Sequence, residues 1–326
     1  MSGTGTAVRA RGDFVNGRWR VPSAPEGLLE KRSPSDLDDE VGLFPWSSAA
    51  VDDAVDAARR AQPDWSGTPL DGRLVLLRKW KDVIGARSES LAVAIAREVG
   101  KPLWEARAEV AALGTKIDVT IAEGLPLVAG FTRENDALEC RFRPHGVLAV
   151  LGPFNFPLHL PHGHVVPALA LGNTIVLKPS EVAPLTAQLY AECAEAAGFP
   201  PGVFNLVQGG GASGAKLGAH PDVDGVLFTG SLAVGIELQR ANVHRPGRLL
   251  ALELGGKNAA LVLDDAPLDK ALHDVLFSAF VTAGQRCTAV SRVIVTKAHA
   301  DLFCEALVAG ARRLVVGRWD DPGVFM

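Results

Sequence analysis

Cys287 is the residue of this sequence whose type and surroundings are best suited to a nucleophile. It lies in Val281-Thr-Ala-Gly-Gln-Arg-Cys-Thr288, where an apolar helical stretch gives way to a turn that contains glycine. The adjacent Arg286 would favour the thiolate, the form of cysteine that attacks carbon. The alternative is a buried, unreactive thiol, which is the usual state of a free cysteine. The other cysteines have apolar or Ala-rich neighbours and are predicted to be structural: Cys140, Cys193 and Cys304.

Glu253 and Asn155 could assist such a nucleophile. Glu253 follows the strand-like run 249–252, at the end where parallel sheets keep their sites. Burial there would make its carboxylate a better proton acceptor, which suits a general base; a solvated or salt-bridged glutamate is the alternative. Asn155 lies in the loop Gly152-Pro-Phe-Asn-Phe-Pro157, where its amide could hold an oxyanion. The alternative there is a turn asparagine that bonds its own backbone.

Two glycine-containing turns could face a phosphate. Gly209–Gly214 matches G-x-G-x-x-G, follows a strand-like run and begins a helix. The next strand should end with an acidic residue but ends Phe228-Thr-Gly-Ser231, so a standard dinucleotide cradle is not favoured. The later turn, Thr229–Gly235, could hold a phosphate at a helix start, or Ser231 could be an ordinary N-cap.

Other polar clusters are less specific. His159, His162 and His164 are closely spaced, but no carboxylate or cysteine completes a ligand set, so no metal site is predicted. Lys178 and Glu181 follow another strand-like run and could bind a ribose or simply flank a helix start.

Alternating strands and helices must position these residues. Residues 1–45 have the pattern of short strands and turns. Helices are expected after Ser48, which is predicted to be the N-cap, and over 70–85, 88–99 and 103–122. Residues 125–145 predict a hairpin that turns at 133–136. Strand-like runs then recur between helical stretches, at 146–151, 174–177, 203–207, 226–229, 249–252 and 259–263. This order predicts an α/β fold with a doubly wound parallel sheet, and a helix–strand–helix pattern over 266–313 predicts the start of a second α/β domain.

Composition narrows the class of protein. The 326 residues are 48% hydrophobic and carry a net charge of −4, which gives no broad surface for nucleic acid. No apolar run reaches the ~18 residues of a membrane span, and the N-terminus has no apolar signal segment. Four cysteines without a C-x-x-C pair make no disulfide framework. We therefore expect a cytoplasmic protein that binds neither nucleic acid nor membranes.

Taken together, the motifs resemble the aldehyde dehydrogenase superfamily, over essentially the whole chain. Five ordered segments carry the resemblance: Gly152–Pro157, Gly172–Glu181, Phe228–Ser231, Leu252–Lys257 and Gly284–Cys287. Further matches, in 153–161, 163–168 and 280–288, resemble one subgroup of this family. Its substrate is a semialdehyde of arginine breakdown, and that substrate bears several carboxylates. His162 and Lys257 stand where that subgroup is expected to have Asn.

The resemblance implies a mechanism and a cofactor. Cys287 would attack the aldehyde, Asn155 and the Cys287 backbone N–H would hold the oxyanion, and Glu253 would activate the water that releases the carboxylate. NAD would accept the hydride, and the carboxylate of Glu181 would repel the 2′-phosphate of NADP. The residues expected to contact NAD are Phe154, Lys178, Ser180, Glu181, Gly230, Ser231, Leu232, Ala233, Val234, Gly235 and Leu254.

The resemblance also implies an organisation. Residues 1–124 and 146–253 would form a Rossmann-like NAD domain, 125–145 an oligomerisation hairpin, and 254–326 part of a catalytic domain. Family members continue for about another third of their length, so we expect the sequence to stop inside the second domain. At full length the protein is expected to be a homodimer or homotetramer, and the 326-residue chain alone is expected to turn over weakly or not at all.

Three rival hypotheses belong to other classes. The chain could be a nucleotide-binding module without dehydrogenase activity. It could be a thiol hydrolase, which needs a histidine base beside Cys287. A purely structural role is the third, and the presence of Asn155, Glu253 and Cys287 together argues against it.

Overall fold

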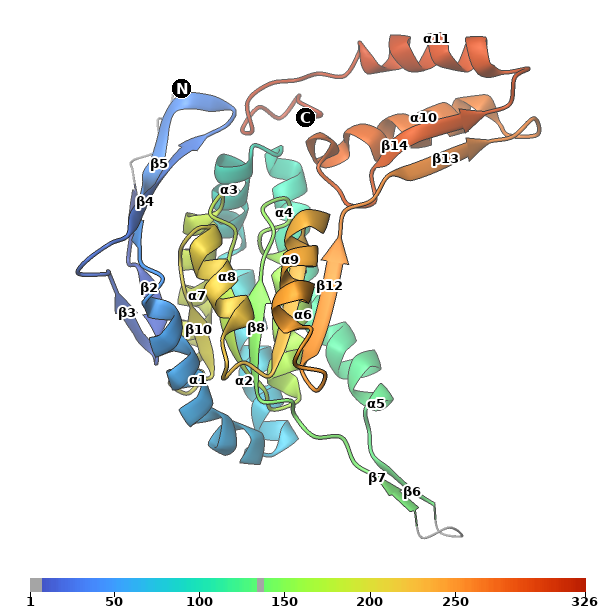
Figure 1. The fold of residues 1–326 in the computed structure, drawn as a ribbon. Helices are drawn as coiled ribbons and strands as arrows, with labels where there is room; N and C mark the ends of the chain where they lie inside the picture. The colour runs from blue at the N-terminus through green and yellow to red at the C-terminus, as the bar shows by residue number, and fades with distance from the viewer. Residues whose placement is uncertain (1–7, 134–137) are drawn as a thin grey trace.

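A seven-stranded sheet forms the centre of the molecule in the computed structural model, which describes residues 8–133 and 138–326 (Figure 1). The strand order is β12-β11-β8-β9-β10-β2-β3. The five strands from β12 to β10 are parallel: β8 (Val147–Leu151), β9 (Thr174–Lys178), β10 (Phe204–Leu206), β11 (Gly225–Gly230) and β12 (Leu249–Leu254). Every side chain of β8 and β9 is buried, as expected for central strands covered on both faces.

The chain winds in two directions from β8. It passes through β9 to β10 and then returns to β11 and β12 on the other side of β8. The helices between these strands are α6 (His159–Ala170), α7 (Pro184–Ala197), α8 (Gly211–Ala219) and α9 (Leu232–Asn242). The predicted doubly wound α/β fold is confirmed. The strand order reverses between β8 and β11, and such a switch point is where open α/β sheets bind ligands.

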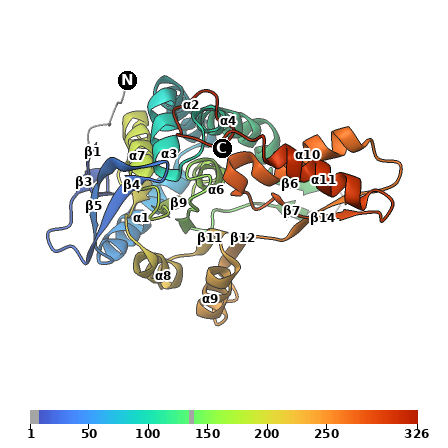
Figure 2. The same ribbon diagram turned by 90° about the horizontal axis from the view of Figure 1, so that it is seen from above.

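Helices cover both faces of the main sheet (Figure 2). Alternate side chains of β8 enter two cores: Leu148 and Val150 join one cluster, whereas Val147, Ala149 and Leu151 join the other. The first core includes residues of α2 (Leu70–Ala86), α3 (Ser88–Val99), α4 (Leu103–Val119), α6 and α7. The second includes residues of α1 (Ala50–Gly67), α8 and α9.

The N-terminal strands add to the sheet in a way that the sequence did not predict. β2 (Asp13–Val15) and β3 (Arg18–Arg20) extend the main sheet, and both are antiparallel to their neighbours. The strands β1 (Val8–Arg9), β4 (Gly27–Ser33) and β5 (Asp36–Trp46) form a separate three-stranded sheet. The prediction that Ser48 caps α1 is wrong, because its hydroxyl bonds the carboxylate of Glu26 at 2.9 Å and the helix begins after Ala49.

A hairpin projects from the body of the molecule (Figure 1). After α4 the chain passes through a π-helical turn (Thr120–Gly124) and α5 (Leu125–Leu127). β6 (Phe131–Arg133) and β7 (Leu138–Cys140) then pair antiparallel, which confirms the predicted hairpin. Most of its predicted turn, at 134–136, lies outside the described residues.

A second, smaller α/β unit follows β12. β13 (Asn258–Val262) and β14 (Val290–Val295) pair in parallel and pack with α10 (Leu268–Phe280) and α11 (Ala300–Ala311) around Val262, Val275 and Phe303. A short 3₁₀ turn, Val281–Gly284, follows α10. None of the helices in the described part of the chain is both long and apolar enough to cross a membrane.

Candidate active site

A cavity of about 1200 Å³ opens at the carboxyl ends of β8, β11 and β12. Asn155, Glu253 and Cys287 all line it, although about a hundred residues or more separate Asn155 from the other two in the sequence. Asn155 follows β8, Glu253 lies near the end of β12, and Cys287 follows the 3₁₀ turn after α10. The fold therefore brings together the three residues predicted to carry the chemistry.

The turn before Cys287 has an unusual backbone. Thr282 and Ala283 have φ of 57° and 52°, in the left-handed region that costs a residue with a Cβ about 1–2 kcal/mol. Such a conformation persists only where surrounding contacts impose it. Cys287 itself is exposed to the cavity, and its carbonyl accepts a hydrogen bond of 2.6 Å from the side chain of Asn258 on β13. The sequence alone did not single out Asn258.

Asn155 joins the two loops of the site. Its Nδ2 donates a hydrogen bond of 2.6 Å to the carbonyl of Gln285, two residues before Cys287. Asn155 therefore bonds a distant loop and not its own backbone, which was the alternative considered for it. An amide nitrogen carries two hydrogens, so the second one stays available to an oxyanion in the cavity.

Glu253 is exposed, so the expectation that it would be buried is wrong. β12 is the edge strand of the main sheet, and the side chain faces the open cavity instead of the core. His164 of α6 also lines this cavity, and its Nε2 lies 3.4 Å from the hydroxyl of Thr229. Burial lowers the pKa of His164, and the charge of Glu253 opposes that shift.

The predicted ribose contacts, Lys178 and Glu181, line the same cavity. Lys178 ends β9 with its side chain 9% exposed, and its ammonium is 3.4 Å from Glu181. Burial lowers the pKa of Lys178, and the charge of Glu181 opposes this. Gly211 and Gly214 border the same cavity, although the sequence did not favour their motif as a dinucleotide cradle. The remaining predicted cofactor contacts that line the cavity are Phe154, Ser180, Gly230, Ser231, Val234 and Leu254.

The turn from β11 to α9 combines both roles considered for it. The hydroxyl of Ser231 accepts a hydrogen bond of 3.3 Å from Val234 N, which is an ordinary N-cap at a helix start that borders the cavity. A Cβ on Gly235 would lie 2.7 Å from the side chain of Leu254, so glycine there lets α9 approach β12. Among the described residues, Leu232, Ala233 and Gly235 are not part of the cavity lining.

The histidine cluster has a structural explanation. The ring of His162 is fully buried, with Nδ1 2.7 Å from the Tyr190 hydroxyl and Nε2 3.0 Å from the Leu113 carbonyl. Across residues 8–133 and 138–326, no group of three His, Cys, Asp or Glu side chains could hold a metal ion. The thiol-hydrolase hypothesis requires a histidine on Cys287, whereas the ring of His164 contacts Thr229. Of the three cysteines predicted to be structural, Cys193 is buried, Cys140 is half-buried and Cys304 is exposed on α11.

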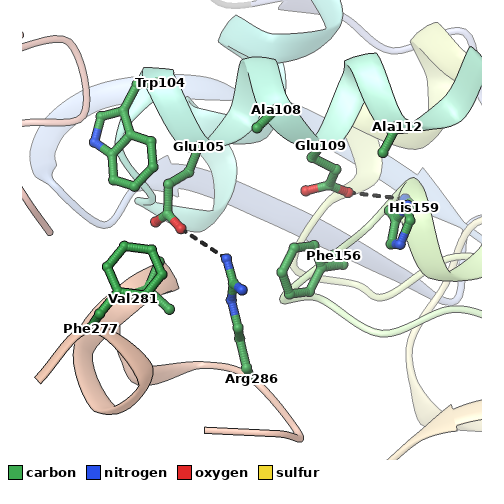
Figure 3. A pocket seen from close by; sticks show the side chains of 10 residues that line it. All are labelled: Trp104, Glu105, Ala108, Glu109, Ala112, Phe156, His159, Phe277, Val281 and Arg286. Atoms are coloured by element: carbon green, nitrogen blue, oxygen red, sulfur yellow. Dashed lines mark hydrogen bonds and ion pairs between the residues drawn. The ribbon is translucent and has the colours of Figure 1, made fainter. Parts of the chain in front are cut away.

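A smaller cavity of about 200 Å³ lies beside the first, and Arg286 borders both (Figure 3). Its wall includes Glu105 and Glu109 of α4 and Phe156 of the Asn155 loop. These glutamates carry no signal in the sequence, because a glutamate on an amphipathic helix ordinarily faces solvent. Only the packing of α4 against loops distant in the sequence makes them buried.

The fold, with its cavity at the switch point of the sheet, is that of an aldehyde dehydrogenase. The aldehyde dehydrogenase family model matches residues 21–326, and the chain belongs to this family. It is 46% identical to N-succinylglutamate 5-semialdehyde dehydrogenase 2 of Caulobacter vibrioides over 320 residues, which cover 95% of this chain and 64% of that protein. The chain thus spans a little under two thirds of the length of that curated relative.

Solved structures agree with the family. An NAD-dependent aldehyde dehydrogenase of Sinorhizobium meliloti matches with a TM-score of 0.91 at 32% identity, covering 98% of this chain and 64% of that one. An NADP-dependent enzyme of E. coli matches with a TM-score of 0.90 at 34% identity, covering 97% and 66%. Because these similar structures are described with different cofactors, the fold alone does not decide between NAD and NADP.

Proposed function

We propose that this chain carries the cofactor site and the nucleophile of an enzyme that oxidises an aldehyde to a carboxylate with NAD. One observation carries the proposal: Asn155, Glu253 and Cys287, from three separate segments, line a single cavity at the switch point of the sheet. A nucleophile, an amide donor and a carboxylate base are the groups that aldehyde oxidation through a thioester requires.

The residues divide the chemistry between them. The thiolate of Cys287 forms a bond to the aldehyde carbon, and the Asn155 amide and the Cys287 backbone N–H hold the resulting oxyanion. NAD supplies the hydride acceptor, so that an acyl thioester is left on Cys287. Glu253 takes a proton from water, the hydroxyl adds to the thioester carbon, and the thiolate leaves as the carboxylate forms. The exposure of Glu253 to the cavity gives water access to it.

The cavity supports a dinucleotide in size and charge. Its volume of about 1200 Å³ exceeds the ~300–1,000 Å³ of ordinary small-molecule pockets. Lys178 and Glu181 offer a cation and a carboxylate for ribose hydroxyls, and the start of α9 favours a pyrophosphate. We propose NAD over NADP because the Glu181 carboxylate would repel a 2′-phosphate.

We propose N-succinylglutamate 5-semialdehyde, an intermediate of arginine breakdown, as the substrate. The similarity to the Caulobacter vibrioides dehydrogenase of that name supports this. A substrate with several carboxylates requires cations, and Lys116 of α4 lines the cavity. Among the described residues its ammonium has no hydrogen-bond or ion-pair partner, so it is available to a carboxylate. A simple aliphatic aldehyde is the alternative substrate.

The larger organisation is also a proposal. We assign NAD binding to 1–124 and 146–253, oligomerisation to the hairpin 125–145, and part of the catalytic domain to 254–326. The projecting β6–β7 hairpin supports a homodimer or homotetramer, because an isolated two-stranded sheet is marginally stable without a partner. A cytoplasmic location accords with the proposed metabolic substrate.

Two variants test the chemistry, each made and assayed in the protein at its full natural length. Cys287→Ser should abolish aldehyde-dependent NADH formation while NAD still binds, measured by absorbance and by cofactor titration. Glu253→Gln should let the acyl-enzyme accumulate, visible as a mass increase on the Cys287 peptide. The wild-type protein should oxidise succinylglutamate semialdehyde in preference to aliphatic aldehydes. Aldehyde oxidation that survives in Cys287→Ser, or rapid acyl-enzyme breakdown in Glu253→Gln, would overturn the assignment.

A further inference from the structure

Two loops form the candidate active site: the loop that carries Asn155 and the turn that leads to Cys287. Helix α4 passes behind both loops, and two of its glutamates face them (Figure 3). Glu105 and Glu109 are four residues apart, so they lie one turn apart on the same face of the helix. Their side chains are 4% and 0% exposed. A carboxylate is costly to bury, so side chains in this position need specific partners.

Glu105 binds the strained turn that precedes Cys287. Its two carboxylate oxygens accept hydrogen bonds of 3.0 and 2.8 Å from the Thr282 backbone N–H, and one of them accepts a third, of 2.9 Å, from the Thr282 hydroxyl. Arg286 donates to the same carboxylate at 3.2 Å and to the Thr282 hydroxyl at 2.8 Å. The residue immediately before Cys287 is thereby tied to α4, and the left-handed Thr282 is held from outside its own turn.

Glu109 binds the loop that carries Asn155. One of its oxygens accepts hydrogen bonds of 3.0 Å from both Leu158 N and His159 N, at the start of α6. The other oxygen pairs with the buried ammonium of Lys101 at 2.7 Å. These amides lie three and four residues after Asn155, so the carboxylate fixes the loop close to the amide donor.

The two loops also meet at Phe156. The Lys101 ammonium lies 4.1 Å from the centre of its ring, and the Arg286 guanidinium lies 5.4 Å from it. Each of these cations is paired with one of the two α4 glutamates. The Asn155–Gln285 hydrogen bond completes the connection on the cavity side.

We propose that Glu105 and Glu109 are positioning residues which fix the separation between the Asn155 amide and the Cys287 backbone N–H. This inference rests on the proposed function, since these two donors are the proposed oxyanion site. The glutamates act through the loops and touch no reacting atom. The turn of helix that separates them sets the spacing of the loops, and the contacts of Glu105 hold the left-handed backbone that orients the Cys287 N–H.

The test compares two reactions of Cys287 in the absence of NAD. Acylation by p-nitrophenyl acetate transfers the acetyl group to Sγ, releases p-nitrophenolate, and passes through an oxyanion. Alkylation by iodoacetamide needs the thiolate but no oxyanion donor. Glu105→Gln places an amide N–H against donors of Thr282 and Arg286, so acylation should slow at least about tenfold, since losing an oxyanion donor costs on the order of 10²–10³. Alkylation should change by less than about threefold.

Controls separate positioning from general destabilisation. Glu89→Gln removes a surface ion pair with Arg107 that lies 2.7 Å apart, and both rates should stay at the wild-type level. The exposed Cys304, followed by peptide mass, gives an internal reference for alkylation in every variant. Thr282→Val keeps the backbone hydrogen bond, loses the hydroxyl, and should give a smaller loss of the same kind; it decides the question if Glu105→Gln does not fold. Glu109→Gln tests the second loop.

The outcomes are distinct. A selective loss of acylation in the α4 variants supports the inference. Equal changes in acylation and alkylation, or no change in either, overturn it. Failure of the proposed function is a different result, since aldehyde oxidation would then survive in Cys287→Ser, whatever the ratio of the two Cys287 reactions in the α4 variants.

Discussion

Acidification should destabilise this protein through His162, a residue of the core and not of the active site. The ring is fully buried against Trp80, with ring centres 5.2 Å apart. The Leu113 carbonyl can only accept, so Nε2 carries the hydrogen, and Nδ1 accepts from the Tyr190 hydroxyl. This neutral tautomer satisfies both contacts. Burial lowers the pKa of His162 to about 3, with smaller effects from nearby His159 and Lys116 and an opposing one from the Leu113 hydrogen bond.

The sign and size of the change in unfolding free energy follow from the linkage between proton binding and folding. In the unfolded chain the pKa of histidine is near 6.5, so below that pH the unfolded state binds a proton that the folded state refuses. The free energy of unfolding therefore falls as the pH drops from about 6.5 toward about 3. Between about pH 7.5 and about pH 5.5 the loss is about 1.4 kcal/mol. This value depends little on the folded pKa as long as that pKa stays well below 5.

The measurement is a pair of urea unfolding curves for the wild type and His162→Gln at both pH values. Glutamine can still donate to the Leu113 carbonyl but does not titrate. Asp13 and Glu98 have pKa values raised by burial to about 7, so acidification stabilises the fold through them, but equally in both proteins. The stability difference between wild type and variant should shrink by about 1.4 kcal/mol at the lower pH.

An unchanged difference between the two proteins would refute this account, because His162 would then titrate alike in the folded and unfolded states. The same conclusion would follow if the C2 proton of the His162 ring shifted with a midpoint near 6.5 in the NMR spectrum of the folded protein. A wild type that loses less on acidification than the variant would reverse the sign of the reasoning.

Two further variants test the proposed ligand contacts. Lys116→Met should raise KM for a substrate with several carboxylates about tenfold, the effect of losing a charged hydrogen bond, and should change KM for an aliphatic aldehyde less than about twofold. Lys270→Met, at an exposed lysine of α10, is the matched control and should leave both KM values unchanged. If Lys116→Met changed KM for both aldehydes equally, Lys116 would be excluded as the carboxylate contact. Glu181→Gln should raise the ratio of kcat/KM with NADP to that with NAD about fivefold, as expected for removing a repulsion of about 1 kcal/mol. An unchanged ratio would mean that Glu181 does not select the cofactor.

The sequence predicted the central sheet well because its signals are local. Buried parallel strands such as β8 and β9 are continuous apolar runs, and the residues after them must lie at one edge. That rule accords with the structure, in which Asn155 and Glu253 line one cavity. The rule could not predict the exposure of Glu253, which depends on β12 being the edge strand. Nor could it predict β2 and β3, because strands of three residues carry too little pattern to choose a partner.

Contacts between distant segments were beyond local patterns. The hydroxyl of Ser48 could cap the helix or bond a residue elsewhere in the chain, and in the fold it bonds Glu26, which lies just before β4. For Glu105, too, the local sequence does not show whether the side chain interacts with its own helix or with a distant segment. On its own helix it would be an ordinary first-turn acid that favours the positive end of the helix dipole. Its partners are 177 and 181 residues away in the sequence.

The position of Glu105 also explains why the left-handed turn at Thr282 could not be anticipated. A β-branched residue disfavours that backbone, so the local sequence Val281-Thr-Ala-Gly284 argues for a turn centred on the glycine alone. In the structure, the carboxylate of Glu105 accepts hydrogen bonds from both the N–H and the hydroxyl of Thr282 while Thr282 is in the left-handed conformation. The contacts of the Glu105 carboxylate on α4 therefore offset the cost of the left-handed backbone that precedes Cys287. A site of this kind becomes visible only when the energy of a local conformation is weighed against the long-range contact that holds it.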